Sequence, residues 1–221
     1  MVYRRTEKVV RRLAARHDAI IAAARALAAE SGMNAVQIAP VAERAGIAAG
    51  TVYRYFPSKT DLVGALVTAV SDHEVGAIRT AADAAPGPLS ALAAAVTTFA
   101  ARALAQQRLA WAMIAEAVDA DTERTRLPYR RVLANEFEAR LLTAIAGKQL
   151  PEQDAAVAAP ALVGALLEGL AGPLAAASAG EGKTREAVQT LTLFALRAVG
   201  VADARARGLV VQAAIPAHDA P

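Results

Sequence analysis

The stretch between Gly46 and Pro57 constrains the fold most, because it leaves room for only one short helix. Gly46 is suited to end a helix, and Pro57 disfavours helical geometry in the residue before it. We therefore expect one short helix over about 38–45 and a second from about 49, joined by a tight turn. Two short helices with a tight turn form a helix-turn-helix unit, whose second helix can enter the major groove of DNA.

Apolar residues recur at helical spacing on both sides of this unit. Before it, a stripe from Leu13 to Leu27 predicts a long helix that ends near Gly32 and is preceded by a basic arm. After it, Ser58 or Thr60 can cap another long helix that runs to about 86. The remaining pattern predicts five further helices, over about 89–106, around Trp111, up to Gly147, over about 151–179 and over about 184–201.

The composition points to the same class of fold. The chain is 55% hydrophobic but only 4% aromatic, and much of it is alanine and leucine. Alanine loses no side-chain entropy in a helix, so this composition favours helices over sheets. We predict an all-α protein of about nine helices. It divides into an arm with a helix-turn-helix domain over 1–60, a larger helical domain over 61–204, and a mobile tail over 205–221.

Positive charge is concentrated at the amino-terminal end. Residues 1–60 hold ten Lys or Arg and four Asp or Glu, a net +6, so the remainder carries −3 within the formal total of +3. A cationic end of this kind is suited to the phosphates of double-stranded DNA, although solvated helix faces give the same count.

Several classes of chemistry find no residues to support them. The chain has no cysteine, which excludes disulfides and cysteine-ligated metals and fits a reducing cytoplasm. Its three histidines, His17, His73 and His218, lie on separate segments, and the common hydrolase and metalloprotease motifs are absent. We therefore expect a cytoplasmic protein that is not an enzyme and needs no metal or cofactor.

The second short helix carries side chains suited to DNA. Ala48 to Gly50 keep its beginning slim, so its backbone can approach base edges closely. Hydroxyl and guanidinium donors follow at Thr51, Tyr53, Arg54 and Tyr55, and Lys59 begins the next helix. Packing is the alternative for single aromatic residues, since Val52 and Phe56 must face the core and Tyr53 could also be packed.

Three short motifs follow one another here: Val41 to Ile47, Gly50 to Tyr53 and Tyr55 to Lys59. Through them, residues 12–66 resemble the DNA-binding domain of the TetR family of bacterial transcriptional regulators. The resemblance implies base or phosphate contacts for Thr51 and Tyr53, and phosphate contacts for Tyr55 and Lys59. The full set of expected DNA-binding residues is Arg4, Arg5, Gln37, Arg44, Ala49, Gly50, Thr51, Tyr53, Arg54, Tyr55 and Lys59.

Some positions depart from the family pattern. Gln37 stands where the family usually has a threonine that caps the second helix, and it can either cap that helix or read adenine through its amide. Ala48 and Ala49 offer only methyl contacts to bases. Arg4 and Arg5 can add contacts if they enter a minor groove as flexible arms do.

The larger half lacks such motifs. The resemblance implies that 61–204 is a helical ligand-binding and dimerisation domain whose last two helices pair with those of a second subunit. Small residues and an apolar stripe support this pairing at Ala161, Gly164, Ala165, Val188, Leu191, Ala195 and Ala198. Candidate pocket residues are His73, Phe99, Trp111, Met113, Glu116, Phe137 and Glu168. For each of them a place in the core or on a solvated face is the more common role, except that Glu168 needs a partner within its apolar run.

These expectations combine into one function: a homodimeric regulator, by family habit a repressor, that binds a palindromic operator and is released by a lipophilic effector. Two alternatives remain. The apolar run 155–179 is long enough to cross a membrane, although Pro160, Glu168 and Pro173 argue against spanning. The chain can also be an architectural DNA-binding protein without an effector.

Overall fold

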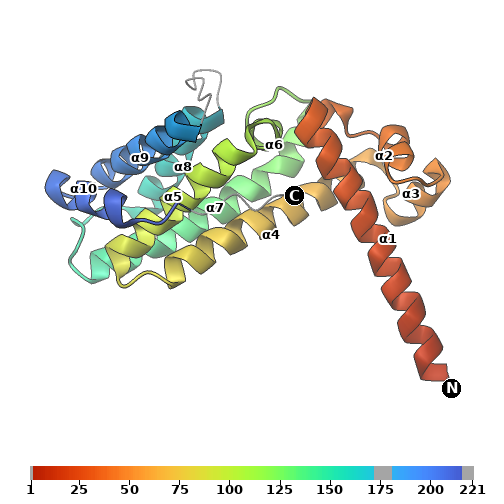
Figure 1. The fold of residues 1–221 in the computed structure, drawn as a ribbon, viewed down its shortest axis with the longest axis horizontal. Coiled ribbons are helices and arrows are strands. Elements are labelled where there is room, and N and C mark those ends of the chain that lie inside the picture. Colours follow the sequence, from red (N-terminus) through yellow and green to blue (C-terminus); the bar gives the residue numbers. More distant parts are fainter. Residues whose placement is uncertain (1, 172–180, 216–221) are drawn as a thin grey trace.

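The computed structural model describes residues 2–171 and 181–215, and every element in them is helical (Figure 1). The ten α-helices and one 3-10 helix, η1, are α1 (Val2–Ser31), η1 (Met33–Ala35), α2 (Ile38–Arg44), α3 (Ala49–Tyr55), α4 (Lys59–Asp83), α5 (Pro88–Ala105), α6 (Gln107–Ile114), α7 (Ala120–Ala146), α8 (Ala155–Ala171), α9 (Glu181–Ala198) and α10 (Asp203–Gln212). The predicted all-α class is confirmed.

The helix-turn-helix forms where the sequence predicts it. Gly46 adopts a φ of 63° after α2, and the backbone N–H of Ile47 donates to the carbonyl of Ala42 at 3.0 Å to close the turn. The α3 helix ends at Tyr55, because Phe56 is extended ahead of Pro57. Val52 and Phe56 are buried, as their spacing predicts. This unit packs on the second half of α1.

Ser58 caps the long helix α4. Its Oγ accepts a hydrogen bond of 3.1 Å from the backbone N–H of Asp61, so Ser58 rather than Thr60 takes the capping role. The helix then runs from the helix-turn-helix unit into the body and packs against α5 and α7 (Figure 1). One continuous helix therefore joins the two halves of the molecule.

The amino-terminal segment differs from the expected arm. Val2–Ser31 is one helix, and its first half extends away from the rest of the molecule (Figure 1). The segment has no glycine or proline to interrupt it, so the helix that begins in the core continues outward. Val9, Val10 and Leu13 are exposed on this extension. Arg4 and Arg5 lie in its first turns.

The body is built around α5. This helix begins at Pro88, whose missing N–H costs nothing in a first turn, and it packs against α4, α7, α8, α9 and α10. It is also the only helix in the described ranges long and apolar enough to cross a membrane, but 61% of it is buried inside the protein. Its apolar character is therefore that of a core helix.

The apolar run 155–179 begins with α8, and residues 172–179 lie outside the described ranges. Leu162, Val163 and Leu166 of α8 face the core, while its opposite face is exposed. Gly169 allows α9 to approach closely, because a Cβ there would lie 2.8 Å from Cδ2 of Leu191. The helix is thus buried on one side only.

The segment after 203 differs from the expected mobile tail. It forms α10, which packs on α9 and α5 with Ala206 and Leu209 buried. Asp203 in its first turn pairs with Arg197 and Arg207, and these hydrogen bonds lower the pKa of Asp203. Two buried side chains on a short helix gave too weak a periodic signal for recognition in the sequence. Residues 216–221 lie outside the described ranges.

Candidate nucleic-acid interface and ligand cavity

The α3 helix presents a polar face to the surrounding solvent. Tyr53 is 52% exposed, and Gly50 and Arg54 are exposed beside it, above the buried Val52. Ala49, Thr51 and Tyr55 are half-buried along its edges. Because Tyr53 is not packed into the core, its ring and hydroxyl are available to a partner. The packing alternative for this aromatic residue does not describe its position.

Two of the predicted DNA-binding cations are engaged within the chain. The Arg44 guanidinium donates to both carboxylate oxygens of Glu30, at 2.6 and 2.5 Å, and this hydrogen bonding lowers the pKa of Glu30. Lys59 Nζ lies 3.6 Å from Oδ2 of Asp119. Arg44, Glu30 and Asp119 are exposed and Lys59 is half-buried, so water and salt can screen these interactions.

Gln37 does not cap its helix. It occupies the residue before α2, but its side chain accepts no hydrogen bond from that helix. Instead Nε2 donates to the carbonyl of Asn34 at 3.1 Å. Of the two roles considered for this residue, capping is therefore wrong, while contact with a base remains a prediction.

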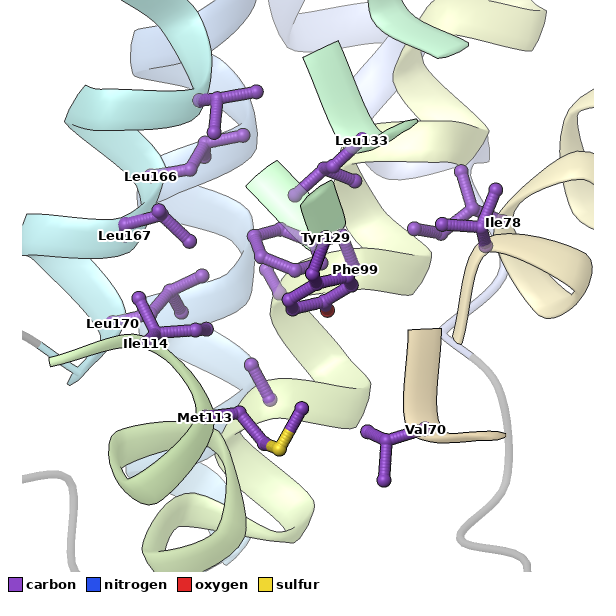
Figure 2. Close-up of a cluster of buried hydrophobic side chains, with 14 of the residues drawn as sticks. Val70, Ile78, Phe99, Met113, Ile114, Tyr129, Leu133, Leu166, Leu167 and Leu170 are labelled. Atoms are coloured by element: carbon purple, nitrogen blue, oxygen red, sulfur yellow. The ribbon is translucent and has the colours of Figure 1, made fainter. Parts of the chain in front are cut away.

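A small cavity lies in the body between α4, α5, α6 and α7. Its volume is about 30 Å³, and it is lined by Val70, Glu74, Phe99, Arg102, Ala103, Gln106, Leu109, Ala110, Met113, Ile114 and Tyr129. Figure 2 shows Phe99, Tyr129, Met113 and Ile114 among the buried side chains around it. Two of the predicted pocket residues, Phe99 and Met113, line this space.

The other predicted pocket residues lie elsewhere. His73 is exposed on the outer side of α4, and Trp111 is half-buried against the Arg108 guanidinium, 4.9 Å from its ring centre. Phe137 is fully buried and packs edge-on against Phe99, with ring centroids 6.5 Å apart. Helical periodicity alone placed these residues in the body but did not give the side on which each lies.

The polar residues that line the cavity were not among the pocket residues predicted from the sequence. Arg102 Nε and Nη2 donate to the two Glu74 carboxylate oxygens at 2.6 and 3.1 Å, and both side chains are largely buried. Tyr129 is also buried, and desolvation raises the pKa of its phenol. One signal was present: Glu74 follows Val70 by four residues and Arg102 follows Phe99 by three, so each charge shares a helix face with an apolar lining residue.

One residue that lines the cavity, Gln106, makes a hydrogen bond to α1. Oε1 of Gln106 accepts a hydrogen bond of 2.5 Å from Nη2 of Arg25, which lies on α1. Gln106 is the residue at which α5 gives way to α6. The Gln106 side chain therefore joins the wall of the cavity to α1.

Glu116 forms a second link between the halves. Its carboxylate is 6% exposed and accepts hydrogen bonds from the backbone N–H of Met33 at 2.6 Å and from Nδ2 of Asn34 at 3.0 Å. Gly32 makes room for it, because a Cβ at that position would lie 2.6 Å from Oε2. Glu116 thus holds the η1 turn ahead of α2 and does not line the body cavity. Its role in a ligand site stays a prediction, because Glu116 lines an open groove beside its own loop instead.

The loop that carries Glu116 is fixed on its other side. Arg126 is 2% exposed and donates to the carbonyls of Ala112 and Glu116, both at 2.9 Å. Asp119 caps α7. Hydrogen bonds from the backbone N–H and the hydroxyl of Thr122, the positive charge of Lys59 and a hydrogen bond from the backbone N–H of Asp121 lower the pKa of Asp119 to about 2. The loop between α6 and α7 is therefore clamped between the body and the DNA-binding unit.

An open groove of about 480 Å³ runs beside this loop. Its walls include Glu123, Arg126 and Arg130 of α7 and Gly164 of α8. The groove also brings together two of the predicted pocket residues, Glu116 and Glu168. Glu168 is exposed at its edge and is absent from the small cavity. Within residues 2–171 and 181–215, no cluster of three potential metal ligands occurs.

The predicted dimer residues divide between surface and core. Ala161, Gly164 and Ala198 are exposed, Ala165 is half-buried, and Leu191 packs against Gly169. Val188 and Ala195 are each 1% exposed inside their own chain, so a second subunit cannot touch them as predicted. Phe194, which was not selected, is 51% exposed on the outer face of α9. An exposed phenylalanine is the better mark of an interface there.

Comparisons with known proteins agree with this geometry. Residues 20–66 match the family of bacterial regulatory proteins called the tetR family. Over 48 residues, 22% of this chain, the sequence is 54% identical to the transcriptional repressor KstR of Rhodococcus jostii and 50% identical to KstR of Mycobacterium tuberculosis. The matched segment spans less than a quarter of these relatives, 23% and 22% of their lengths.

Solved structures share the whole fold. RolR in complex with resorcinol has a TM-score of 0.67 at 21% identity, over 94% of this chain and 98% of that chain. FadR of Bacillus subtilis in complex with stearoyl-CoA has a TM-score of 0.61 at 18% identity, over 87% and 95% of the two chains. At these identities the likeness is one of fold.

Proposed function

We propose that the chain is a ligand-responsive transcriptional repressor of the tetR family, whose model matches residues 20–66. It binds operator DNA through α3 and releases it when a small molecule binds in the helical body. The observation that carries this proposal is the face of α3, where Tyr53, Arg54 and Gly50 are exposed above a buried Val52. Residues 1–60 then form the DNA-binding domain and the helices beyond them form the sensing body.

The α3 helix enters the major groove. The small residues at its beginning, Ala49 and Gly50, allow the backbone to approach the bases, and Thr51 and Tyr53 contact bases or phosphates. Arg44, Arg54, Tyr55 and Lys59 contact phosphates around it, and Gln37 contacts a base. The positions of Arg4 and Arg5, on the first turns of the extended α1, support contacts beyond the main site.

The chain acts as a homodimer through the outer faces of α8 and α9. The exposed small residues Ala161 and Gly164 and the exposed Phe194 support this surface. A dimer places two α3 helices in successive major grooves, about 34 Å apart, so the operator is a palindrome. A monomer at micromolar concentration in size-exclusion chromatography with light scattering would contradict this arrangement.

The effector site is the body cavity. RolR and FadR, which share the fold, hold resorcinol and stearoyl-CoA respectively, and a small lipophilic effector fits the apolar part of the lining here. An effector that favours one arrangement of head and body weakens DNA binding by about 1–3 kcal/mol of coupling. The Arg25–Gln106 and Met33–Glu116 hydrogen bonds are the routes of this coupling.

We place this regulator in the cytoplasm, with no catalytic activity. A membrane-associated helical protein is the second candidate. The burial of most of α5 and of one face of α8 within the body argues against it. An architectural DNA-binding protein without an effector is the third. It differs in that no compound releases it from its site.

One experiment tests the central proposal. DNA sequences are selected from a random pool by the full chain at a fixed salt concentration, because affinity for DNA depends strongly on salt. We expect a palindromic consensus with half-sites one helical turn apart. Selection of no consensus, or of a single half-site, would contradict the proposed dimeric operator complex.

A further inference from the structure

We propose that the body cavity selects an uncharged effector, an apolar molecule with one or two hydroxyl or carbonyl groups, through the Glu74–Arg102 pair and Tyr129. This inference rests on the proposed function, because it takes the cavity as the effector site. It excludes free fatty acids, amines and other ions whose charge must enter the cavity.

The charged residues that line the cavity form one ion pair. Among the described residues that line the cavity, two are charged, Glu74 and Arg102, and they carry opposite signs. Their side chains meet in a two-point contact of 2.6 and 3.1 Å, and each is less than one-sixth exposed, at 15% and 12%. A ligand that enters with a charge of its own adds a buried charge that this lining does not balance, and such a charge is costly.

The same residues can hydrogen-bond a neutral polar group. A carboxylate oxygen has lone pairs beyond those that Arg102 uses, so Glu74 can accept from a ligand hydroxyl. The phenol of Tyr129 stays protonated, because burial raises its pKa, and it can donate to a ligand carbonyl or hydroxyl. The Gln106 amide adds a donor at the wall that Arg25 approaches from α1.

The rest of the lining fits an apolar body. Val70, Phe99, Leu109, Met113 and Ile114 surround the pair, and these side chains offer no hydrogen bonds. The present volume, about 30 Å³, holds roughly one water molecule, so an effector must displace its walls. Met113 is the residue best able to move, because its unbranched side chain adapts its shape easily. It lies on α6, whose end leads into the loop of Glu116.

A matched series of probes tests the charge rule. Decanol, decanoate and decylamine share one chain and differ in the charge of their head group, and resorcinol, benzoate and benzylamine form an aromatic counterpart. Calorimetric titration of the full chain at neutral pH should show that the neutral member binds at least about tenfold more tightly than both ions in one series or the other, a difference of about 1.4 kcal/mol.

Variants of the pair give the sharper result. Glu74→Gln removes one negative charge from the lining, so the ratio of decanoate to decanol affinity should rise by about tenfold or more. The double variant Glu74→Gln with Arg102→Met removes both charges and should restore the preference for the neutral probe. His73→Gln, on the exposed side of the same helix, is the matched control and should leave the ratio unchanged. Thermal melts confirm that each variant is folded.

Three outcomes overturn the inference: tighter binding of an ion than of its neutral partner by the wild-type chain, binding of none of the probes, or an unchanged ratio in a folded Glu74→Gln variant. Operator binding, measured with the same preparation, separates this failure from failure of the proposed function. If the chain selects an operator and an anionic compound releases it, the proposed function as a regulator holds, and the inference of an uncharged effector is wrong. If it selects no operator, the proposed function fails whatever the probes show.

Discussion

The Glu116 carboxylate accepts a hydrogen bond of 2.6 Å from the backbone N–H of Met33, across 83 positions of sequence. This bond joins the loop after α6 to the turn that leads into the helix-turn-helix. The carboxylate is buried, and Asn34 also donates to it. The body and the DNA-binding unit therefore share a polar contact that neither half can satisfy alone.

Replacing this carboxylate should weaken both stability and signalling. Glu116→Ala leaves the buried N–H of Met33 without its acceptor, so the free energy of unfolding should fall by about 1–3 kcal/mol. Urea denaturation measures this loss, and Glu43→Ala on the exposed surface of α2 is the control. In a folded variant, the effector should release operator DNA less completely than in the wild type. An unaltered response would remove Glu116 from the coupling route.

Gly32 should not tolerate a side chain. Its φ of 87° with a ψ of 175° is a region that residues other than glycine rarely adopt, and a Cβ would collide with Glu116 Oε2 at 2.6 Å. Gly32→Ala should cost about 1–3 kcal/mol from the backbone alone, plus the cost of the collision. In the Glu116→Ala background only the backbone cost should remain. Equal losses in both backgrounds, measured by urea denaturation, would show that the collision contributes nothing.

The two kinds of DNA contact should respond differently to salt. Lys59→Ala should weaken operator binding and reduce the slope of log affinity against log salt by about one, because it removes a phosphate contact. Tyr53→Phe should weaken binding with little change of slope, since it removes a hydroxyl and no charge. Fluorescence anisotropy over a salt series measures both, and Thr68→Ala on the exposed side of α4 is the control. If both variants bind the operator with wild-type affinity, neither Lys59 nor the Tyr53 hydroxyl makes the proposed contact.

Substitutions on the outer and inner faces of α9 should affect different properties, dimerisation and stability respectively. Phe194→Asp places a charge on the proposed dimer surface and should yield a folded monomer in light scattering. Val188→Ala instead leaves a cavity inside one chain, so it should lower the free energy of unfolding by about 1–3 kcal/mol without dissociating the dimer. A dimeric Phe194→Asp protein would place the subunit interface elsewhere.

Tyr129 should make the protein sensitive to alkali. Burial raises the pKa of its phenol above the ordinary value of about 10, so the folded state keeps the proton after the unfolded chain has lost it. The folded state then binds more protons, and stability falls as pH rises from about 10. Tyr129→Phe removes this contribution. Its melting temperature should fall less between neutral and alkaline pH than that of the wild type, and a parallel decline would contradict the prediction.

Local patterns predicted the DNA-binding unit well because its determinants are close in sequence. Pro57 fixes the end of α3, and the spacing of Val52 and Phe56 fixes which side is buried. The cavity and the links between halves depend on residues far apart, such as Glu74 with Arg102 and Met33 with Glu116. Helical periodicity identifies a face but not its neighbour. It could not show that Val188 meets its own core and not a second subunit.

The contact between Lys59 and Asp119 has a consequence for the resting state of the protein. An operator phosphate that approaches Lys59 meets an ammonium already partly neutralised by a carboxylate of the loop before α7. Phosphate and carboxylate then compete for the same cation, and each weakens the hold of the other. The loop that carries Asp119 also carries Glu116, so we expect operator DNA bound at Lys59 to compete for the same loop that holds the η1 turn.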